Sequence, residues 1–379
     1  HIARELGMPL DDVRAVNYYG TDERNVTPYQ QTVKDNIIVP LVERLQAEVD
    51  FDGMSKAVDD FNASHETLKK GLALMPVKFG ISFNTPKLNQ AGALVHVYAD
   101  GSVHLNHGGT EMGQGLFTKV AQVVASVFQI DLDNIKISAT RTDKVPNTSA
   151  TAASSGSDLN GMAAFNAANT IKDRMTGVAA EIFDTDADQV EFRQNRVYAG
   201  NESLSFSELA EQTYNRRVQL SAAGFYSTPG LHWDAKSLIG NPFYYFTYGA
   251  AIAEVVIDTL TGESRVLRAD MLQDCGNSLN PAIDIGQIEG AFVQGQGWLT
   301  SEELVWNDRG QLLTHGPSTY KIPGSRDVPP VFNVHILEDA PNRFPTVFRS
   351  KAVGEPPLML AISVWLAIRD AVSRISDHR

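Results

Sequence analysis

Apolar residues recur with two different periods along this chain, and the change from one period to the other limits the folds that it can adopt. Between Ala91 and Asn106 they alternate around an Asp-Gly turn, which is the pattern of a β-hairpin. Between Leu116 and Val127 they fall on one face of a helix instead. A chain that carries both patterns is predicted to fold as a mixed protein of the α+β or α/β class.

The same two signals predict elements along the rest of the chain. Further helices are predicted at Ile37 to Val49, Lys56 to Leu72, Met162 to Ile182 and Leu358 to Ile375. A second hairpin is predicted from Tyr245 to Leu272, with its turn at 259–262. Shorter strands are predicted at Ile135 to Ala139, Val190 to Val197 and Val331 to Leu337. Helices therefore interleave with strands through most of the sequence.

Charge and cysteine content argue against several classes of function. The formal net charge of −13 disfavours nucleic acid and an anionic membrane surface as partners, because both attract basic proteins. The single cysteine, Cys275, cannot form an internal disulfide, a structural zinc site or an iron–sulfur cluster, and it fits a cytoplasmic protein. The longest apolar run, Leu358 to Ile368, is too short to span a bilayer. Because the chain begins at His1 without an initiator methionine, we expect a fragment, a processed chain or a split subunit.

Four segments rich in Gly, Ser, Gln and Glu share one design, since each is predicted to stand directly before a helix. They are residues 108–115, 151–157, 284–290 and 351–357. A helix start leaves backbone N–H groups unpaired, and small residues let a ligand approach those groups closely. If the four starts converge, they can bind a phosphate and a polar ring system. The alternative interpretation is that each segment is an ordinary helix cap.

Glu355, in the fourth segment, is the strongest single candidate for catalysis. Pro356 disfavours helical backbone geometry for the residue before it, so Glu355 is predicted to lie just outside the last helix. The helix dipole then favours its ionised form. A rigidly held, ionised carboxylate is suited to act as a general base. The alternative is a glutamate that only caps the helix.

Nucleotide-binding motifs with their glycine and lysine spacing do not fit these segments. Five longer motifs resemble those of the molybdenum hydroxylases, and among these the xanthine dehydrogenases most, at residues 107–115, 145–154, 280–295, 316–323 and 350–357. The resemblance implies the C-terminal half of a molybdopterin-binding subunit, folded as two α/β subdomains. Residues 1–85 would end the first molybdenum-cofactor-binding domain, and residues 86–379 would form the second.

The resemblance implies a reaction on purines. Hypoxanthine would be oxidised to xanthine and xanthine to urate, with water as the oxygen source and Glu355 as the catalytic base. Phe83, Ala152 and Ala153 would line the substrate pocket. The pterin sulfurs would hold the molybdenum, with the backbone of Ala153 near the metal and no side-chain ligand. The residues implied to bind the molybdopterin are Met112, Gly113, Gln114, Ala153, Ser154, Ser155, Gly156 and Gln287.

The resemblance also implies partners. The N-terminal half of the molybdenum subunit would supply the remaining pocket residues, and an iron–sulfur and FAD subunit would pass electrons through 2Fe-2S clusters and FAD to NAD. The chain would be active only with both, in a dimer of heteromers. Two departures from the family concern the site: Asn84 stands where the compared xanthine enzymes carry threonine, and Gly156 stands where the family carries serine.

Two other functions stay open at the level of sequence. A molybdenum hydroxylase for an aldehyde or another N-heterocycle would share these motifs, because the residues that decide the substrate belong to the other half of the subunit. A non-catalytic fragment without cofactor would use the same four segments as caps only. Cofactor content separates the last of these from the enzymes.

Overall fold

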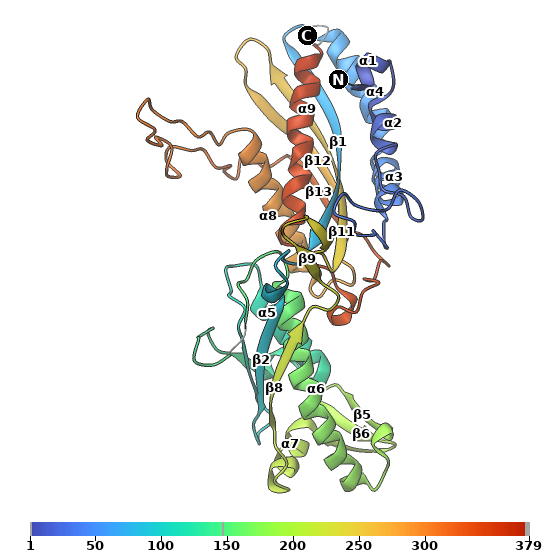
Figure 1. The fold of residues 1–379 in the computed structure, drawn as a ribbon, viewed down its shortest axis with the longest axis vertical. Coiled ribbons are helices and arrows are strands. Elements are labelled where there is room, and N and C mark those ends of the chain that lie inside the picture. Colours follow the sequence, from blue (N-terminus) through green and yellow to red (C-terminus); the bar gives the residue numbers. More distant parts are fainter. Residues whose placement is uncertain (1, 146–147, 376–379) are drawn as a thin grey trace.

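The computed structural model describes residues 2–145 and 148–375, which form two lobes joined end to end (Figure 1). Part of one motif, Pro146 and Asn147, lies outside the described residues. Each lobe contains a four-stranded sheet, and helices cover both sheets. The prediction of a mixed α/β fold with two subdomains is therefore confirmed.

The first lobe is built on a sheet with the strand order β1-β11-β12-β13. The bounds of these strands are Leu68–Ile81, Tyr245–Asp258, Ser264–Gln273 and Val331–Ile336. β1 pairs antiparallel with β11 along its whole length, and its last residue, Ile81, lies opposite Tyr245. The chain thus leaves the first lobe after Ile81 and returns to it at Tyr245, so these two strand ends face the second lobe.

Helices bury both faces of the first sheet, because successive strand residues point to opposite sides. Ala251 and Ala253 of β11 belong to one core cluster, together with residues of α8 and α9. Ala250 and Ile252 belong to another, together with residues of α3. The helices of this lobe are α1 Ile2–Leu6, α2 Leu10–Ala15, α3 Ile38–Val49, α4 Phe51–Ser64, α8 Pro281–Leu299 and α9 Ile362–Ser373.

The second lobe is built on a sheet with the order β4-β3-β2-β8, which packs against α5 and α6. Gly224 of β8 allows a close approach, because a Cβ there would stand 2.0 Å from the carbonyl oxygen of Ala163 in α6. The bounds are β2 Gln90–Val97, β3 Val103–His107, β4 Ile135–Ile137, β8 Ser221–Ser227, α5 Leu116–Phe128 and α6 Gly156–Phe183. The far end adds β5 Val190–Arg193, β6 Arg196–Ala199, β7 Glu202–Ser205 and α7 Phe206–Asn215. Between the lobes lies a small hairpin of β9 His232–Asp234 and β10 Ile239–Asn241.

Most predicted elements are present, including both hairpins, and two predictions are wrong. The predicted helix from Lys56 to Leu72 ends at Ser64, and Leu68 already begins β1. β1 is covered by α9 on one side and by α3 and α4 on the other, so its sequence lacks the regular alternation of apolar and polar residues that identifies a strand with one buried face. The predicted strand from Val190 to Val197 is a hairpin of β5 and β6. The expected domain boundary at residues 85 and 86 falls between β1 and β2, and the division itself stays a prediction.

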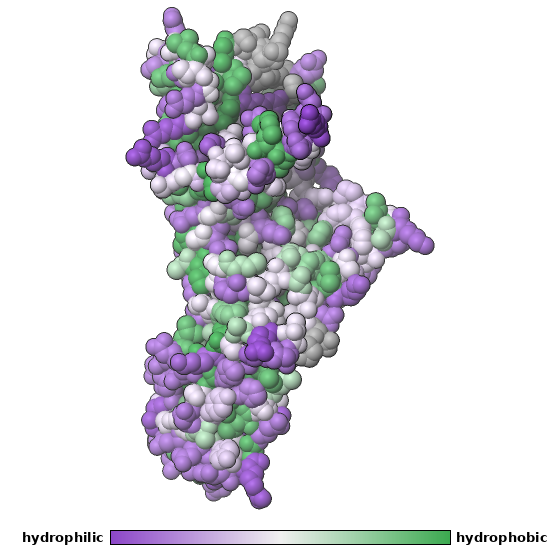
Figure 2. Space-filling model, turned by 90° about the vertical axis from the view of Figure 1, so that its left-hand side faces the viewer, coloured by the Kyte–Doolittle hydropathy of each residue, from purple (hydrophilic) through white to green (hydrophobic). Residues whose placement is uncertain are grey.

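Exposed apolar side chains are spread along the molecule. Figure 2 shows hydrophobic residues among hydrophilic ones over the length of one face. The segment between α8 and β13, which extends away from the first lobe in Figure 1, contributes several of them. These are Leu304, Val305, Trp306, Leu313 and Ile322. Of the described residues, Pro356–Ser373 is long and apolar enough to cross a bilayer, but half of it is buried, and its α9 part packs against β1 and β11.

Candidate functional site

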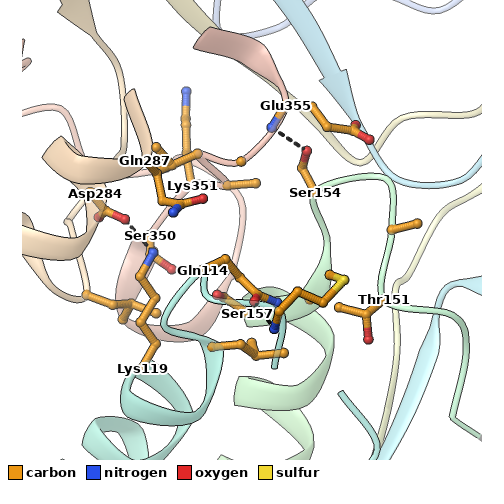
Figure 3. A pocket seen from close by; sticks show the side chains of 18 residues that line it. Gln114, Lys119, Thr151, Ser154, Ser157, Asp284, Gln287, Ser350, Lys351 and Glu355 are labelled. Carbon is orange, nitrogen blue, oxygen red and sulfur yellow. Dashed lines mark hydrogen bonds and ion pairs between the residues drawn. The ribbon is translucent and has the colours of Figure 1, made fainter. Parts of the chain in front are cut away.

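The four Gly/Ser-rich segments converge on one cavity of about 260 Å³ between the lobes. The second lobe contributes the loops before α5 and α6, and the first lobe contributes α8 and the loop before the last helix. In Figure 3 Ser154 and Glu355 lie on one side of the cavity, Asp284 and Gln287 lie on the other, and Gln114 lies between them. Convergence, which the sequence could only suggest, is therefore a property of the fold.

The first segment is held rigid by its own side chains. The carboxylate of Glu111 accepts hydrogen bonds from the backbone N–H groups of Gly113, Gly115 and Phe117, at 2.8, 3.1 and 2.9 Å. Burial raises the pKa of Glu111, but these N–H donors outweigh burial, and the net pKa is lowered. The amide of Gln114 bonds within the same loop, to Met112 N and to the Thr110 carbonyl oxygen. Glu111 thus caps α5, and the side chain of Met112 stays 67% exposed.

The second segment carries strained backbone at the start of α6. Ala153 and Ser154 both have positive φ values, 54° and 57°, a conformation that is rare for residues other than glycine and that often marks a functional site. The hydroxyl of Ser155, the N-cap residue, donates to the Ala152 carbonyl oxygen at 3.1 Å. Among the described residues no side chain therefore caps α6 from its N-cap position, and the positive end of this helix stays available to a ligand.

The third segment differs from the prediction. α8 begins at Pro281, where the side chain of Asn280 caps it by accepting from Ile283 N at 3.1 Å, so residues 284–290 lie inside the helix and not before it. Proline is favoured at the first helical position, and the helix therefore begins at Pro281, about one turn earlier than the glycine pattern indicated. The segment still reaches the cavity, because Asp284 and Gln287 lie one turn apart on the face that lines it. Asp284 forms a buried ion pair there with Lys119 of α5.

Hydrogen bonds hold the fourth segment near both of its ends, at Lys351 and at Glu355. The buried ammonium group of Lys351 binds Asp274 at 2.6 Å and the carbonyl oxygen of Phe246 at 3.0 Å. At the other end, the backbone N–H of Glu355 donates to the hydroxyl of Ser154 at 3.0 Å (Figure 3). Glu355 precedes a 3-10 helix, η5 (Pro356–Ala361), as predicted, but its own backbone is helical, at φ −86° and ψ −41°, because proline only disfavours that conformation.

The structure brings together most of the predicted site residues. Those that line the cavity are Met112, Gln114, Ala152, Ser154, Gly156, Gln287 and Glu355. Gly113, Ala153 and Ser155 belong to the same loops without lining it, and Phe83 lies apart from the lining. Phe83 is held by the buried amide of Asn89, which binds its backbone N–H at 2.8 Å and its carbonyl oxygen at 2.9 Å.

Three charged residues at the site were missed by the sequence reasoning. Lys119, Asp158 and Lys351 are all buried, and two of them line the cavity. A signal existed for Lys119, since it lies on the apolar face of α5 beside Val120 and Val123. A charge at such a position is rare without a partner. Its partner lies 165 positions further on, so pairing was not visible in the sequence.

The arrangement suits a polar, anionic ligand. The side chains of Gln287 and Ser157 line the cavity and have no hydrogen-bond partner among the described residues. A Cβ at Gly156 would make only ordinary contacts, at 3.4 Å and beyond, so the serine that the family carries there would also fit. Together with the open start of α6, these groups offer donors and acceptors on two sides of the cavity.

Comparison with known proteins agrees with this chemistry. The family model for the molybdopterin cofactor-binding domain matches residues 44–329. Xanthine dehydrogenase of Dictyostelium discoideum is 46% identical over 375 residues, and xanthine dehydrogenase 1 of Arabidopsis thaliana is 47% identical over 378 residues. Both alignments cover 98% of this chain and 26% of the relative, so the chain spans about a quarter of the length of these curated relatives.

The fold is also found among solved structures. Quinoline 2-oxidoreductase from Pseudomonas putida 86 superposes with a TM-score of 0.84 at 22% identity, over 98% of this chain and 48% of that one. At this identity the likeness shows the fold alone. The family assignment follows from the matched domain and from the identity to the xanthine dehydrogenases across nearly the whole chain. The chain therefore belongs to the family of molybdopterin cofactor-binding domains.

Proposed function

We propose that this chain forms part of the catalytic centre of a xanthine dehydrogenase, a molybdenum hydroxylase that oxidises hypoxanthine to xanthine and xanthine to urate. The observation that carries the proposal is the meeting of Glu355 with three loop or helix segments of the cofactor-binding family in one cavity. The names of the curated relatives support purines as substrates. Aldehydes and other N-heterocycles are the competing substrates.

The cavity fits the molybdopterin that the family binds. The open start of α6 suits the phosphate of the cofactor, because helix N–H groups and the helix dipole favour an anion. Gln287 and Ser157 can bond the polar edges of the pterin. In this proposal the pterin sulfurs hold the molybdenum, and within residues 2–145 and 148–375 no group of three His, Cys, Asp or Glu side chains is placed to hold a metal. When bound, the cofactor would supply the two-electron redox centre for hydroxylation with oxygen from water.

In this proposal Glu355 is the general base. Its backbone is fixed to Ser154 while its side chain is exposed at the cavity, so it can accept a proton at a carboxylate oxygen without moving the loop. Ala152 lines the same cavity with a methyl group only, which leaves room for a flat purine ring. Help of this kind from a positioned base is worth roughly 10²–10⁴-fold in rate.

The remaining parts of the enzyme are proposed to lie outside this sequence. The curated relatives are about four times as long as the matched part. We place the rest of the molybdenum subunit, the 2Fe-2S clusters, FAD and the NAD site there, in a dimer of heteromers in the cytoplasm. The one cysteine of this chain, Cys275, is buried and cannot hold a cluster alone.

The test is Glu355→Gln in the complete enzyme, with Glu211→Gln as a control of equal charge change on the surface of α7. We expect Glu355→Gln to lower kcat for xanthine by roughly 10²–10⁴-fold, because a general base is lost. Molybdenum and pterin content should stay equimolar with the chain in both variants, by metal analysis and fluorescence of the oxidised pterin. Near-normal kcat would remove Glu355 from catalysis, whereas wild-type enzyme active without molybdenum would overturn the function itself. Faster turnover of an aldehyde or nicotinate than of xanthine would overturn the purine assignment.

A further inference from the structure

A buried tyrosine connects the start of α6 to the segment that carries Glu355. The hydroxyl of Tyr245 donates to a carboxylate oxygen of Asp158 at 2.6 Å and accepts from the backbone N–H of Ala352 at 2.8 Å. Tyr245 is 1% exposed and Asp158 is 7% exposed. Buried hydrogen bonds to a charged group are stronger than surface ones, and their loss leaves a polar group unsatisfied. We call this connection the Asp158–Tyr245 bridge.

The bridge joins three parts of the fold. Asp158 lies in the first turn of α6 in the second lobe, Tyr245 begins β11 in the first lobe, and Ala352 stands three residues before Glu355. A parallel link joins Ser154, four residues before Asp158, directly to the N–H of Glu355. The segment 352–355 is thus tied at both of its ends to the same helix start.

We propose that Asp158, acting through Tyr245, is a positioning residue that fixes the Glu355 segment against the start of α6 and so sets the place of the base in the cavity. The inference rests on the proposed function only in taking Glu355 as the base. Asp158 itself does not line the cavity, so its effect on catalysis has to pass through Tyr245 and the backbone of Ala352. A residue that holds geometry in this way changes turnover more than cofactor binding.

The charges around Asp158 fit this role. Lys119 of α5 faces it, as do the phenol groups of Tyr226, Tyr244 and Tyr245. Burial raises the pKa of Asp158 to about 7, although the hydrogen bond from Tyr245 and the charge of Lys119 lower it. The second carboxylate oxygen of Asp158 is buried with no partner among the described residues. Among the described residues, the bond from the Tyr245 hydroxyl is therefore the one hydrogen bond that the Asp158 carboxyl group makes.

The experiment measures hydrogen exchange of the peptide around residues 350–356 in the complete enzyme, by mass spectrometry. Tyr245→Phe removes the acceptor of the Ala352 N–H, so exchange there should rise roughly 2- to 10-fold, the range for loss of one hydrogen bond. Tyr248→Phe is the matched control, because Tyr248 lies on the same strand, is equally buried, and its hydroxyl has no partner among the described residues. It should leave that peptide unchanged.

Substitutions at Asp158 complete the test. Asp158→Asn keeps an acceptor for the Tyr245 hydroxyl, so it should retain most of the wild-type protection of the Ala352 N–H against exchange. Asp158→Ala should lose that protection, as Tyr245→Phe does. kcat for xanthine should follow the same order, with KM and pterin content held near the wild-type values. Unchanged exchange in Tyr245→Phe would overturn the proposal, and so would faster exchange throughout β11 and α6, which indicates general destabilisation. Because exchange is read without turnover, this outcome is independent of whether Glu355 proves to be the base.

Discussion

At the scale of single residues, Asp158 brings a carboxyl group into the protein interior beside the cavity, and its ionisation should be visible in stability. Its pKa rises from 3.8 to about 7 on folding, chiefly through burial. Between these two values the folded state binds a proton that the unfolded state has lost, so stability from this group is full below pH 3.8 and is lost as pH rises through 7.

Asp158→Asn removes this dependence, which gives a prediction at the residue scale. In urea unfolding from pH 5 to pH 8, the free energy of unfolding of the wild type relative to Asp158→Asn should fall by about 1.4 kcal/mol per pH unit up to pH 7 and then level off. A constant difference between the two proteins across this range would show that Asp158 is ionised throughout, and that the Tyr245 hydrogen bond dominates over burial.

Single residues also show where prediction from the sequence ends. Glu355 was identified because the sequence signal for it is local: it is a carboxylate between a glycine and a pair of prolines, directly before a helix. Asp158 and Lys351 were not, although each stands within four residues of a predicted site residue, because their roles depend on Tyr245 and Asp274, which are distant in the sequence. Polar residues that act through long-range partners carry no local pattern to read.

At the scale of elements, the loop before α5 depends on one carboxylate. Glu111 accepts from three backbone N–H groups and so replaces the missing side-chain cap at Gly115. The same loop supplies Met112 and Gln114 to the cavity. Loss of this carboxylate should therefore loosen a helix start and a wall of the site together.

The prediction is that Glu111→Gln lowers stability by about 1 kcal/mol, the usual value of a lost cap, and also lowers the pterin retained after gel filtration. Glu208→Gln is the control, because Glu208 forms the capping box of α7 with Ser205, far from the cavity. It should reduce stability without loss of pterin. Equal pterin retention in both variants would mean that the first segment only caps α5.

The predictions of helices and strands include both the most accurate and the least accurate ones made from the sequence. The β2–β3 and β11–β12 hairpins were predicted almost to the residue, because a turn signal separates two strand-like runs in each. The first five residues of β1, Leu68 to Leu72, were assigned to the preceding helix, because β1 pairs with a strand about 170 residues later and its own sequence lacks a clear period. The start of α8 was placed too late because Asn280 and Pro281, an ordinary cap and first-turn proline, were passed over for the glycines.

At the scale of the whole molecule, the site exists only while the two lobes stay together. Each lobe has its own sheet and core, and the cavity takes two segments from each. The buried ion pair of Lys119 and Asp284 joins α5 of the second lobe to α8 of the first at the floor of this cavity. Removing one partner of such a pair leaves the other charge buried and unpaired.

Lys119→Met is therefore predicted to lower stability by roughly 3–5 kcal/mol, whereas the double variant Lys119→Met with Asp284→Leu should regain most of that loss. Lys70→Met is the control, because its pair with Glu254 lies within the first lobe and is partly exposed, so the effect should be much smaller. Limited proteolysis should cut Lys119→Met faster in the connections between the lobes, residues 82–89 and 228–244. If Lys119→Met unfolds like the double variant and its connections resist protease, packing alone holds the lobes together and the ion pair serves only the polarity of the cavity.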